Sequence, residues 1–165
     1  MKDHWKNRVH PNLDHIMSLF DRPELAAFMT GHLILESVLV QLIELKLTDS
    51  DQINLFDLSF PNKVNMAKSR GLIGEKMGEF LLEMNSVRNR LAHRLCEPIE
   101  FDRMYSLAKV AHQGGVEFSD DTIHSDRSKS LEWYGVEGII QEIFQNVAQS
   151  LSFIMEEHGG EFQFA

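Results

Sequence analysis

The residues best suited to chemistry lie in one segment, 80–95, whose apolar positions repeat every three or four residues as in an amphipathic helix. Within it, Arg88, Asn89 and His93 fall on one stripe about 140° wide, the motif stripe, because successive helical residues turn by about 100°. Asn89 precedes His93 by one turn, so the two side chains can meet. A guanidinium is a permanent cation, whereas an imidazole is the side chain type best suited to exchange protons near neutral pH. The motif stripe therefore predicts a site that binds an anion and moves a proton.

Cleavage of RNA without a metal ion is the reaction that these residues fit best. The ribose 2′-hydroxyl would attack the adjacent phosphate, with His93 taking its proton or protonating the leaving oxygen. Arg88 would bind the phosphate and stabilise the charge that develops on it. Asn89 would orient His93 or touch the phosphate. Arg90 and Arg94 are candidates for secondary phosphate contacts, although the helix turns them further away.

The rest of the sequence shows no second motif with recognisable chemistry. It has no Gly-rich phosphate loop, no Cys/His metal set and no acidic cluster arranged as a metal site, so we expect neither a cofactor nor a metal. His4, His10 and His15 do not have the spacing of a helical ligand pair and are expected on the surface. One acid–base group per chain is too few for proton transfer at both oxygens. The site therefore predicts a homodimer that brings two copies of the motif stripe together.

The scaffold that must position these side chains is predicted to be an all-α, single-domain bundle of five to six helices over residues 1–165. The sequence has no internal repeat and no strand-like alternation. The expected helices cover 11–20, 23–47, 59–71, 74–97, 99–112 and 130–158. Residues 1–10 and 160–165 are expected to be flexible, and 113–129 to form one long loop with a disordered or functional role.

The segment 25–47 is predicted to be the central helix or part of a dimer interface, because it is apolar over much of its surface. Asp21, followed two residues later by a proline, predicts a carboxylate cap at its start. Gly31, His32 and Glu36 lie close together on this helix. A packing point or a local hydrogen bond explains these three residues better than catalysis does.

The motif R-N-x-x-x-H at Arg88–His93, near the end of an amphipathic helix, resembles the signature of the HEPN domain, a family of small helical proteins found in many prokaryotic conflict systems. The order of elements is also similar, with a long apolar helix at 25–47, a loop, FPNKVNMAKSRGLI and then the motif helix. The resemblance covers roughly 13–111. It implies a helical ribonuclease whose active site forms at a dimer cleft from the Arg and His of both protomers. It further implies a toxin or phage-defence role and an antitoxin or regulatory protein as a possible partner.

One departure and one second resemblance leave other functions open. HEPN toxins paired with a nucleotidyltransferase antitoxin carry a modified tyrosine two residues after the histidine, where this chain has Leu95, which puts adenylylation at that position in doubt. The sequence KVNMAKSRGLI followed by RNRLAH is also similar to the mannitol operon repressor family. That similarity implies a non-catalytic regulator or adaptor that acts through protein–protein contacts.

A purely structural role for the motif is the third interpretation, since a histidine on a helix is more often structural than catalytic. Asn89 and His93 would then satisfy buried polar groups. Arg88 would pair with Glu83 or Glu97.

Charge and composition narrow the class of protein. The net charge of −9 argues against a protein that coats nucleic acid, because phosphate neutralisation needs surplus Lys and Arg. Residues 62–110 nevertheless carry a net charge of +3, enough for a local basic patch that admits one RNA strand. The only cysteine, Cys96, excludes an internal disulfide and is compatible with a reducing cytoplasm. The N-terminus lacks the apolar core of a signal peptide, and Glu36 and Gln41 interrupt the most apolar stretch. We expect a cytoplasmic protein without a membrane partner.

Overall fold

Every regular element of residues 12–163, the part of the chain that the computed structural model describes, is helical. In chain order the elements are α1 (Leu13–Ser18), α2 (Pro23–Glu44), the 3₁₀ helix η1 (Leu55–Asp57), α3 (Phe60–Ser69), α4 (Glu75–His93), α5 (Phe101–Gln113), α6 (Thr122–Ser125) and α7 (Arg127–Glu157). The predicted all-α bundle is confirmed. The described residues contain seven α-helices rather than five to six, because the single turn α6 has too few residues to show a period.

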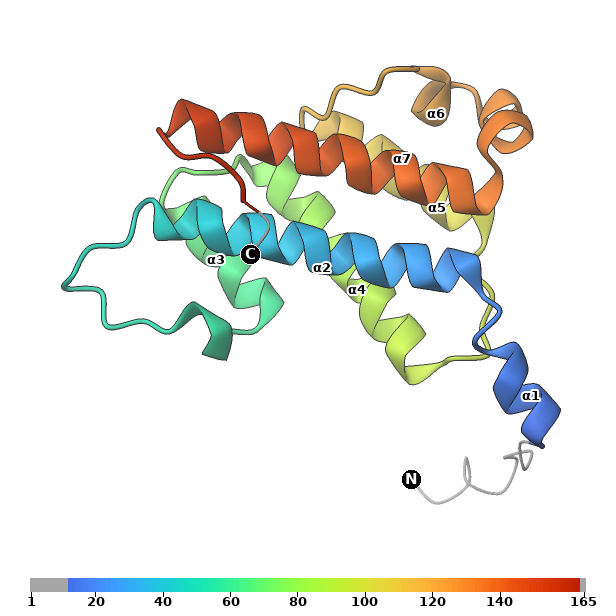
Figure 1. Cartoon of the computed structure of the whole chain (residues 1–165). Helices are drawn as coiled ribbons and strands as arrows, with labels where there is room; N and C mark the ends of the chain where they lie inside the picture. The colour runs from blue at the N-terminus through green and yellow to red at the C-terminus, as the bar shows by residue number, and fades with distance from the viewer. Residues whose placement is uncertain (1–11, 164–165) are drawn as a thin grey trace.

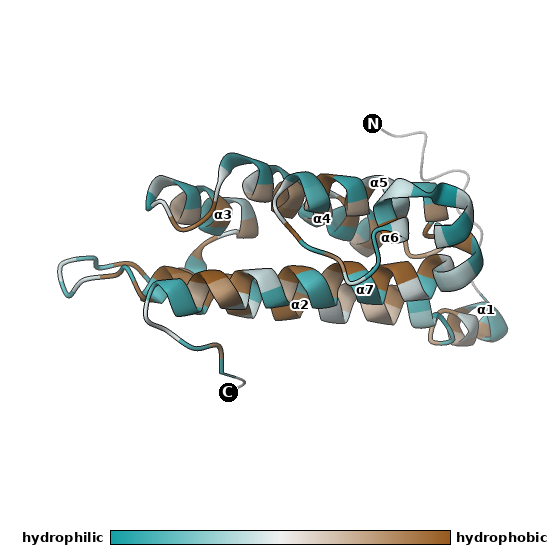
Figure 2. Cartoon of the chain, turned by 90° about the horizontal axis from the view of Figure 1, so that it is seen from above, coloured by the Kyte–Doolittle hydropathy of each residue, from teal (hydrophilic) through white to brown (hydrophobic). Residues whose placement is uncertain are grey.

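The helices form two layers. The long helices α2 and α7 lie side by side in front in Figure 1, and α3, α4 and α5 lie behind them. Figure 2, seen from above, shows the two layers edge-on with apolar residues facing the space between them. The helix α2 contacts α3, α4 and α7, so it is the central helix that its apolar composition predicts.

A glycine allows the two long helices to approach closely. A Cβ atom on Gly31 of α2 would lie 2.2 Å from Cγ of Phe144 on α7, so any side chain there would displace the ring. The same ring meets Phe28 edge-on, with ring centroids 5.0 Å apart. Gly31 is therefore the close packing point that the sequence suggested for its neighbourhood.

The start of α2 and the end of α4 differ from the sequence expectation for a reason that their contacts explain. The N-cap of α2 is Arg22 rather than Asp21, and its side chain makes no capping hydrogen bond. Its guanidinium instead donates to the backbone oxygens of Leu95 and Glu97, the latter at 2.9 Å. These contacts hold the loop after α4, so α4 ends at His93 instead of continuing to residue 97.

Residues 113–129, expected to form one long loop, contain α6 and the first turn of α7. Local side-chain bonds order this segment: Asp120 accepts from the backbone N–H of Thr122 at 2.9 Å and from the hydroxyl of Tyr134 at 2.5 Å. Asp126 caps α7 through the backbone N–H of Lys129 at 3.1 Å. Burial of Ile123 anchors the segment to the bundle.

The end of the described chain lies against α2. The side-chain amide of Gln41 donates to the backbone oxygen of Gln163 at 2.7 Å and accepts from its N–H at 3.0 Å. Residues 160–163, which the sequence suggested as flexible, are thus held by hydrogen bonds. Residues 1–11 and 164–165 lie outside the described part of the chain.

The sequence suggested that Glu36 and Gln41 make the segment of α2 too polar to cross a membrane. Despite Glu36 and Gln41, this helix is long and apolar enough to span a membrane by length and composition alone. Half of its most apolar stretch is buried inside the bundle, and the core helix of a globular domain has the same character.

Candidate functional site

The helix α4 carries the whole motif stripe on one continuous element. Its apolar face packs into the core through side chains that include Phe80, Met84 and Leu91. Beside this face, Arg88 is half-buried, whereas Asn89 and His93 are exposed. His93 is the last residue of the helix, so its imidazole lies at an open end rather than in the core.

Arg88 differs from every other arginine of residues 12–163, because it alone has no carboxylate within ion-pair distance. Its Nη1 donates to Oδ1 of Asn89 at 3.2 Å. Its Nε is buried and has no hydrogen-bond partner in the described part of the chain. The buried Nε is closed to an external ligand, but a guanidinium without a carboxylate partner among the described residues keeps its full charge, which favours an anion near its exposed end.

The structural interpretation of the motif does not fit these contacts. Glu83 lies 3.7 Å from Arg103, and both oxygens of Glu97 accept from other arginines, so neither glutamate pairs with Arg88. Asn89 and His93 are exposed and satisfy no buried polar group among the described residues. The structural roles that the sequence suggested for Arg88, Asn89 and His93 are therefore not seen among the described residues.

Arg90 and Arg94, the candidates for secondary phosphate contacts, are both occupied by Glu97. The Nε of Arg90 and the Nη1 of Arg94 each lie 2.7 Å from one of its carboxylate oxygens. These hydrogen bonds, first that from Arg90 and then that from Arg94, lower the pKa of the Glu97 carboxyl. The positive charge of these two arginines is thus partly neutralised within the protomer.

A buried polar cluster lies under the motif stripe, where α2, α3 and α4 meet. Nε2 of His32 lies 3.1 Å from Oδ1 of Asn85, one helical turn before Arg88 and Asn89. His32 is 3% exposed and packs against the ring of Phe60, with centroids 4.7 Å apart. Burial lowers the pKa of His32, because the charged form loses its hydration.

The cluster continues from His32 to Glu36, one turn further along the same face of α2. Its Nδ1 lies 4.0 Å from Oε2 of Glu36, and Oε1 of Glu36 accepts from the ammonium of Lys63 at 2.5 Å. Lys63 is 4% exposed, so its charge is held inside the bundle by this carboxylate. The sequence suggested a local hydrogen bond among Gly31, His32 and Glu36. Glu36 does lie beside His32, but the hydrogen bonds of these two side chains go to Asn85 on α4 and Lys63 on α3.

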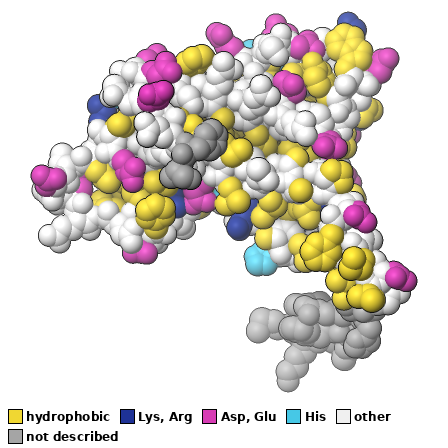
Figure 3. All heavy atoms as spheres, viewed as in Figure 1, with side chains coloured by type: hydrophobic (Ala, Val, Ile, Leu, Met, Phe, Trp, Pro, Cys, Tyr) yellow, Lys and Arg dark blue, Asp and Glu magenta, His cyan; other side chains and the backbone are white. Residues whose placement is uncertain are grey.

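The surface around the site is mixed in character. On the face shown in Figure 3, histidine and basic side chains lie near the centre, with apolar patches beside them. Leu13 and Phe20, on and just after α1, are 72% and 80% exposed. The imidazole of His15 on α1 lies 3.6 Å from the thiol of Cys96, so this apolar helix sits next to the end of α4.

No group of three or more His, Cys, Asp or Glu side chains within residues 12–163 is arranged to hold a metal ion. His15 is exposed, whereas His4 and His10 lie outside the described residues. In comparisons with known proteins, no family model, no curated protein and no solved structure matches the chain. Its function must therefore be inferred from the chemistry and the placement of its own residues.

Proposed function

We propose that this chain is a metal-independent endoribonuclease of the HEPN type that acts as a homodimer, as a toxin or phage-defence effector. The observation that carries the proposal is the guanidinium of Arg88, which has no carboxylate partner among residues 12–163 and lies on the same helix as the exposed His93. A phosphate diester is the kind of anion that such a guanidinium binds through two N–H groups. The imidazole of His93, five residues further along the helix, supplies the acid–base group that cleavage of RNA by its own 2′-hydroxyl requires.

In the proposed reaction the ribose 2′-oxygen forms a bond to phosphorus, and the bond from phosphorus to the 5′-oxygen breaks. His93 accepts the proton of the 2′-hydroxyl, and the partner's His93 donates a proton to the leaving 5′-oxygen. Arg88 stabilises the negative charge on the non-bridging oxygens, and Asn89 fixes the guanidinium through its side-chain oxygen. The products are a 2′,3′-cyclic phosphate and a 5′-hydroxyl end.

The surface near His93 supports a dimer at this place. Leu13 and Phe20 are exposed on and next to α1, which touches the loop after α4 through His15 and Cys96. Exposed apolar side chains grouped at one end of a molecule are typical of interaction surfaces. A two-fold axis near this end would cover α1 and bring both copies of the motif stripe to one cleft.

A regulator or adaptor of the mannitol-repressor type is the second candidate, and the same exposed residues favour it. In addition to Leu13 and Phe20 at α1, the aromatic ring of Phe56 in η1 is 79% exposed. A module that works through protein contacts needs such surfaces but does not need His93. The two candidates therefore differ in whether removal of the imidazole changes the biological effect.

The deciding experiment is cleavage of RNA by the purified chain in the presence of EDTA, with the product ends identified. We expect cyclic phosphate ends, and a loss of about 100-fold or more in rate for His93→Ala and for Arg88→Ala. Lys76→Gln is the matched control, because Lys76 is an exposed cation at the opposite end of α4, paired with Glu79 at 2.7 Å. Equal cleavage by wild type and both site variants, or cleavage that EDTA abolishes, would refute the proposal.

A further inference from the structure

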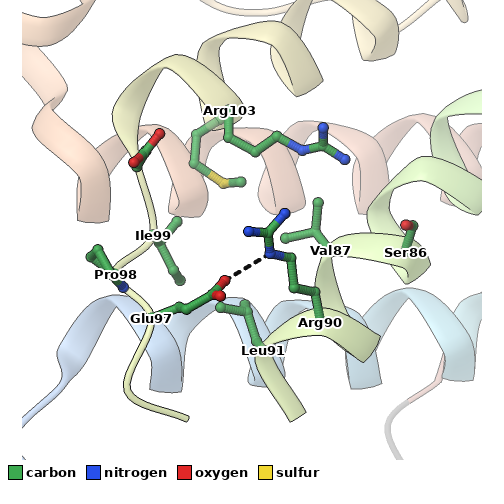
Figure 4. A pocket seen from close by; sticks show the side chains of 10 residues that line it. Ser86, Val87, Arg90, Leu91, Glu97, Pro98, Ile99 and Arg103 are labelled. Atoms are coloured by element: carbon green, nitrogen blue, oxygen red, sulfur yellow. Dashed lines mark hydrogen bonds and ion pairs between the residues drawn. The ribbon is translucent and has the colours of Figure 1, made fainter. Parts of the chain in front are cut away.

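A hollow begins beside the motif stripe and takes no part in the chemistry described above. It lies between α4, α5 and the loop that joins them, has a volume of about 490 Å³ and is drawn in Figure 4. This volume is within the range of small-molecule sites. Its apolar wall is made of the largely buried side chains of Val87, Leu91, Ile99 and Met104.

The hollow adjoins His93 along the surface of α4. Ser86 and Arg90, which line the hollow, precede His93 by seven and three residues, so the three side chains follow one face of the helix. Arg90 and His93 are separated by about 4.5 Å along the helix axis. A strand of RNA with its phosphate at Arg88 and its ribose at His93 would therefore place a neighbouring nucleotide at the hollow.

The hollow is lined by two basic and two acidic side chains, so their charges cancel. Arg90 and Arg103 extend into it from α4 and α5, as Figure 4 shows, and Glu97 and Glu100 face it from the connecting loop. Glu97 accepts from Nε of Arg90, which leaves the two terminal nitrogens of Arg90 without a hydrogen-bond partner in the described chain. The carboxylate of Glu100 has no hydrogen bond or ion pair there either. Because two carboxylates offset the two guanidiniums, the hollow has no net positive charge to favour a phosphate, and its donors and acceptors suit an uncharged base better than the backbone.

Among the bases, guanine matches this set of donors and acceptors best. Its O6 and N7 both accept hydrogen bonds and form the commonest specific pair with arginine. Its N1–H and its amino group donate on the other edge, where a carboxylate accepts. Uracil has no amino group, and adenine has a donor in the position where guanine carries O6. The apolar wall supplies the face against which a flat base packs.

We propose that this hollow is a guanine-binding subsite, in which Arg103 and Arg90 contact the O6/N7 edge and Glu100 accepts from the N1–H and the amino group. The subsite rests on the proposed nuclease function and names the substrate feature that the enzyme selects. It makes the chain a ribonuclease that cleaves within one nucleotide of a guanosine.

The test is titration of the purified full chain with GMP, AMP, CMP and UMP by calorimetry, alongside mapping of cleavage sites on one unstructured RNA. We expect GMP to bind about tenfold or more tightly than UMP, which is the discrimination that one bidentate pair supplies. Glu100→Gln and Arg103→Gln should each reduce GMP affinity to that of UMP, whereas Lys76→Gln should keep the preference. Circular dichroism and urea unfolding confirm that each variant is folded.

The outcomes separate the subsite from the nuclease. Equal affinity for all four nucleotides, or a GMP preference that survives both substitutions, would overturn the subsite. If RNA is then still cleaved without a preference for guanosine, the nuclease stands and the subsite falls. A GMP preference that depends on Glu100 and Arg103, in a chain that cleaves no RNA, would retain the subsite as a nucleotide site and reject the nuclease. His93→Ala should keep GMP affinity in every case where the subsite exists.

Discussion

Nε2 of His32 on α2 lies 3.1 Å from Oδ1 of Asn85 on α4, and this buried contact joins the central helix to the helix of the motif stripe. An amide oxygen only accepts hydrogen bonds, so Nε2 carries the proton and Nδ1 is the bare nitrogen. The second nitrogen, Nδ1, has no hydrogen-bond partner among the described atoms. This bond helps to fix the turn of α4 that carries Arg88, together with the packing of the buried side chains of Met84 and Leu91.

Asn85→Leu should lower the free energy of unfolding by about 1–3 kcal/mol, because it leaves both nitrogens of the buried His32 ring without partners. The double substitution His32→Leu with Asn85→Leu should recover part of this loss, since two apolar side chains leave no unpaired polar atom. Urea unfolding at pH 7 measures the stabilities of wild type, Asn85→Leu, His32→Leu and the double variant. A double variant less stable than the sum of the two single effects would contradict this account.

Stability should fall as the pH drops below neutrality, and His32 should account for part of the fall. Burial lowers its pKa from the ordinary 6.5, helped by the charges of Arg88 and Lys63 and opposed by Asn85 and Glu36. The unfolded chain then binds a proton at a pH where the folded chain does not, which favours unfolding. The stability contribution of neutral His32 is therefore complete above about pH 6.5 and decreases as the pH falls below that value.

The measurement is the free energy of unfolding of wild type and His32→Gln between pH 7 and 5, and the slope should be shallower for the variant. His124 supplies a second contribution of the same sign, because burial and the stacked ring of His112, 3.8 Å away, also lower its pKa. His124→Gln is thus the companion variant. Parallel curves of stability against pH for wild type and His32→Gln would contradict this prediction, because they would mean that folding does not change the pKa of His32.

Arg88→Met should abolish RNA cleavage and leave stability unchanged or slightly higher. The guanidinium has a buried Nε without a partner and no ion pair in the described chain, so removing it removes a cost of folding. A residue that reduces stability while serving chemistry is expected at a functional site. The same samples are used for urea unfolding and for the cleavage assay. A loss of several kcal/mol would instead assign Arg88 a structural role.

Loss of one partner of the Glu36–Lys63 ion pair should lower the stability of the protein, whereas loss of both partners should change the stability little. Glu36→Gln leaves the ammonium of Lys63, 4% exposed, without a counter-charge, and should cost on the order of 3 kcal/mol. Replacing the pair by Leu and Met should restore most of the stability, because no buried charge remains. Denaturant midpoints of the two variants test this. Equal stability of wild type and Glu36→Gln would mean that solvent reaches Lys63.

The sequence predicted what depends on local periodicity. The apolar face of α4 and the motif stripe beside it follow from spacing alone, and so does the burial of α2. The sequence could not predict contacts between distant segments: His32 and Asn85 are 53 residues apart, and Arg22 meets the loop at Glu97 across 75 residues. These contacts decide where α4 ends and what lies beneath the motif stripe. The sequence shows that Arg90 and Arg94 are basic, but it does not show that Glu97 pairs with both of them.

Gly31→Ala should destabilise the protein although alanine favours helices. Its Cβ would lie 2.2 Å from the ring of Phe144, which is packed between α2 and α7, and overpacking of this kind costs about 1–3 kcal/mol. The gain in helix propensity offsets about 1 kcal/mol of that. Gly78→Ala is the matched control on α4, since its Cβ would meet only the flexible chain of Lys68, at 2.5 Å. That side chain can move aside, so Gly78→Ala should be neutral or stabilising in thermal unfolding. Equal effects at the two positions would show that the ring of Phe144 yields as readily as a lysine chain.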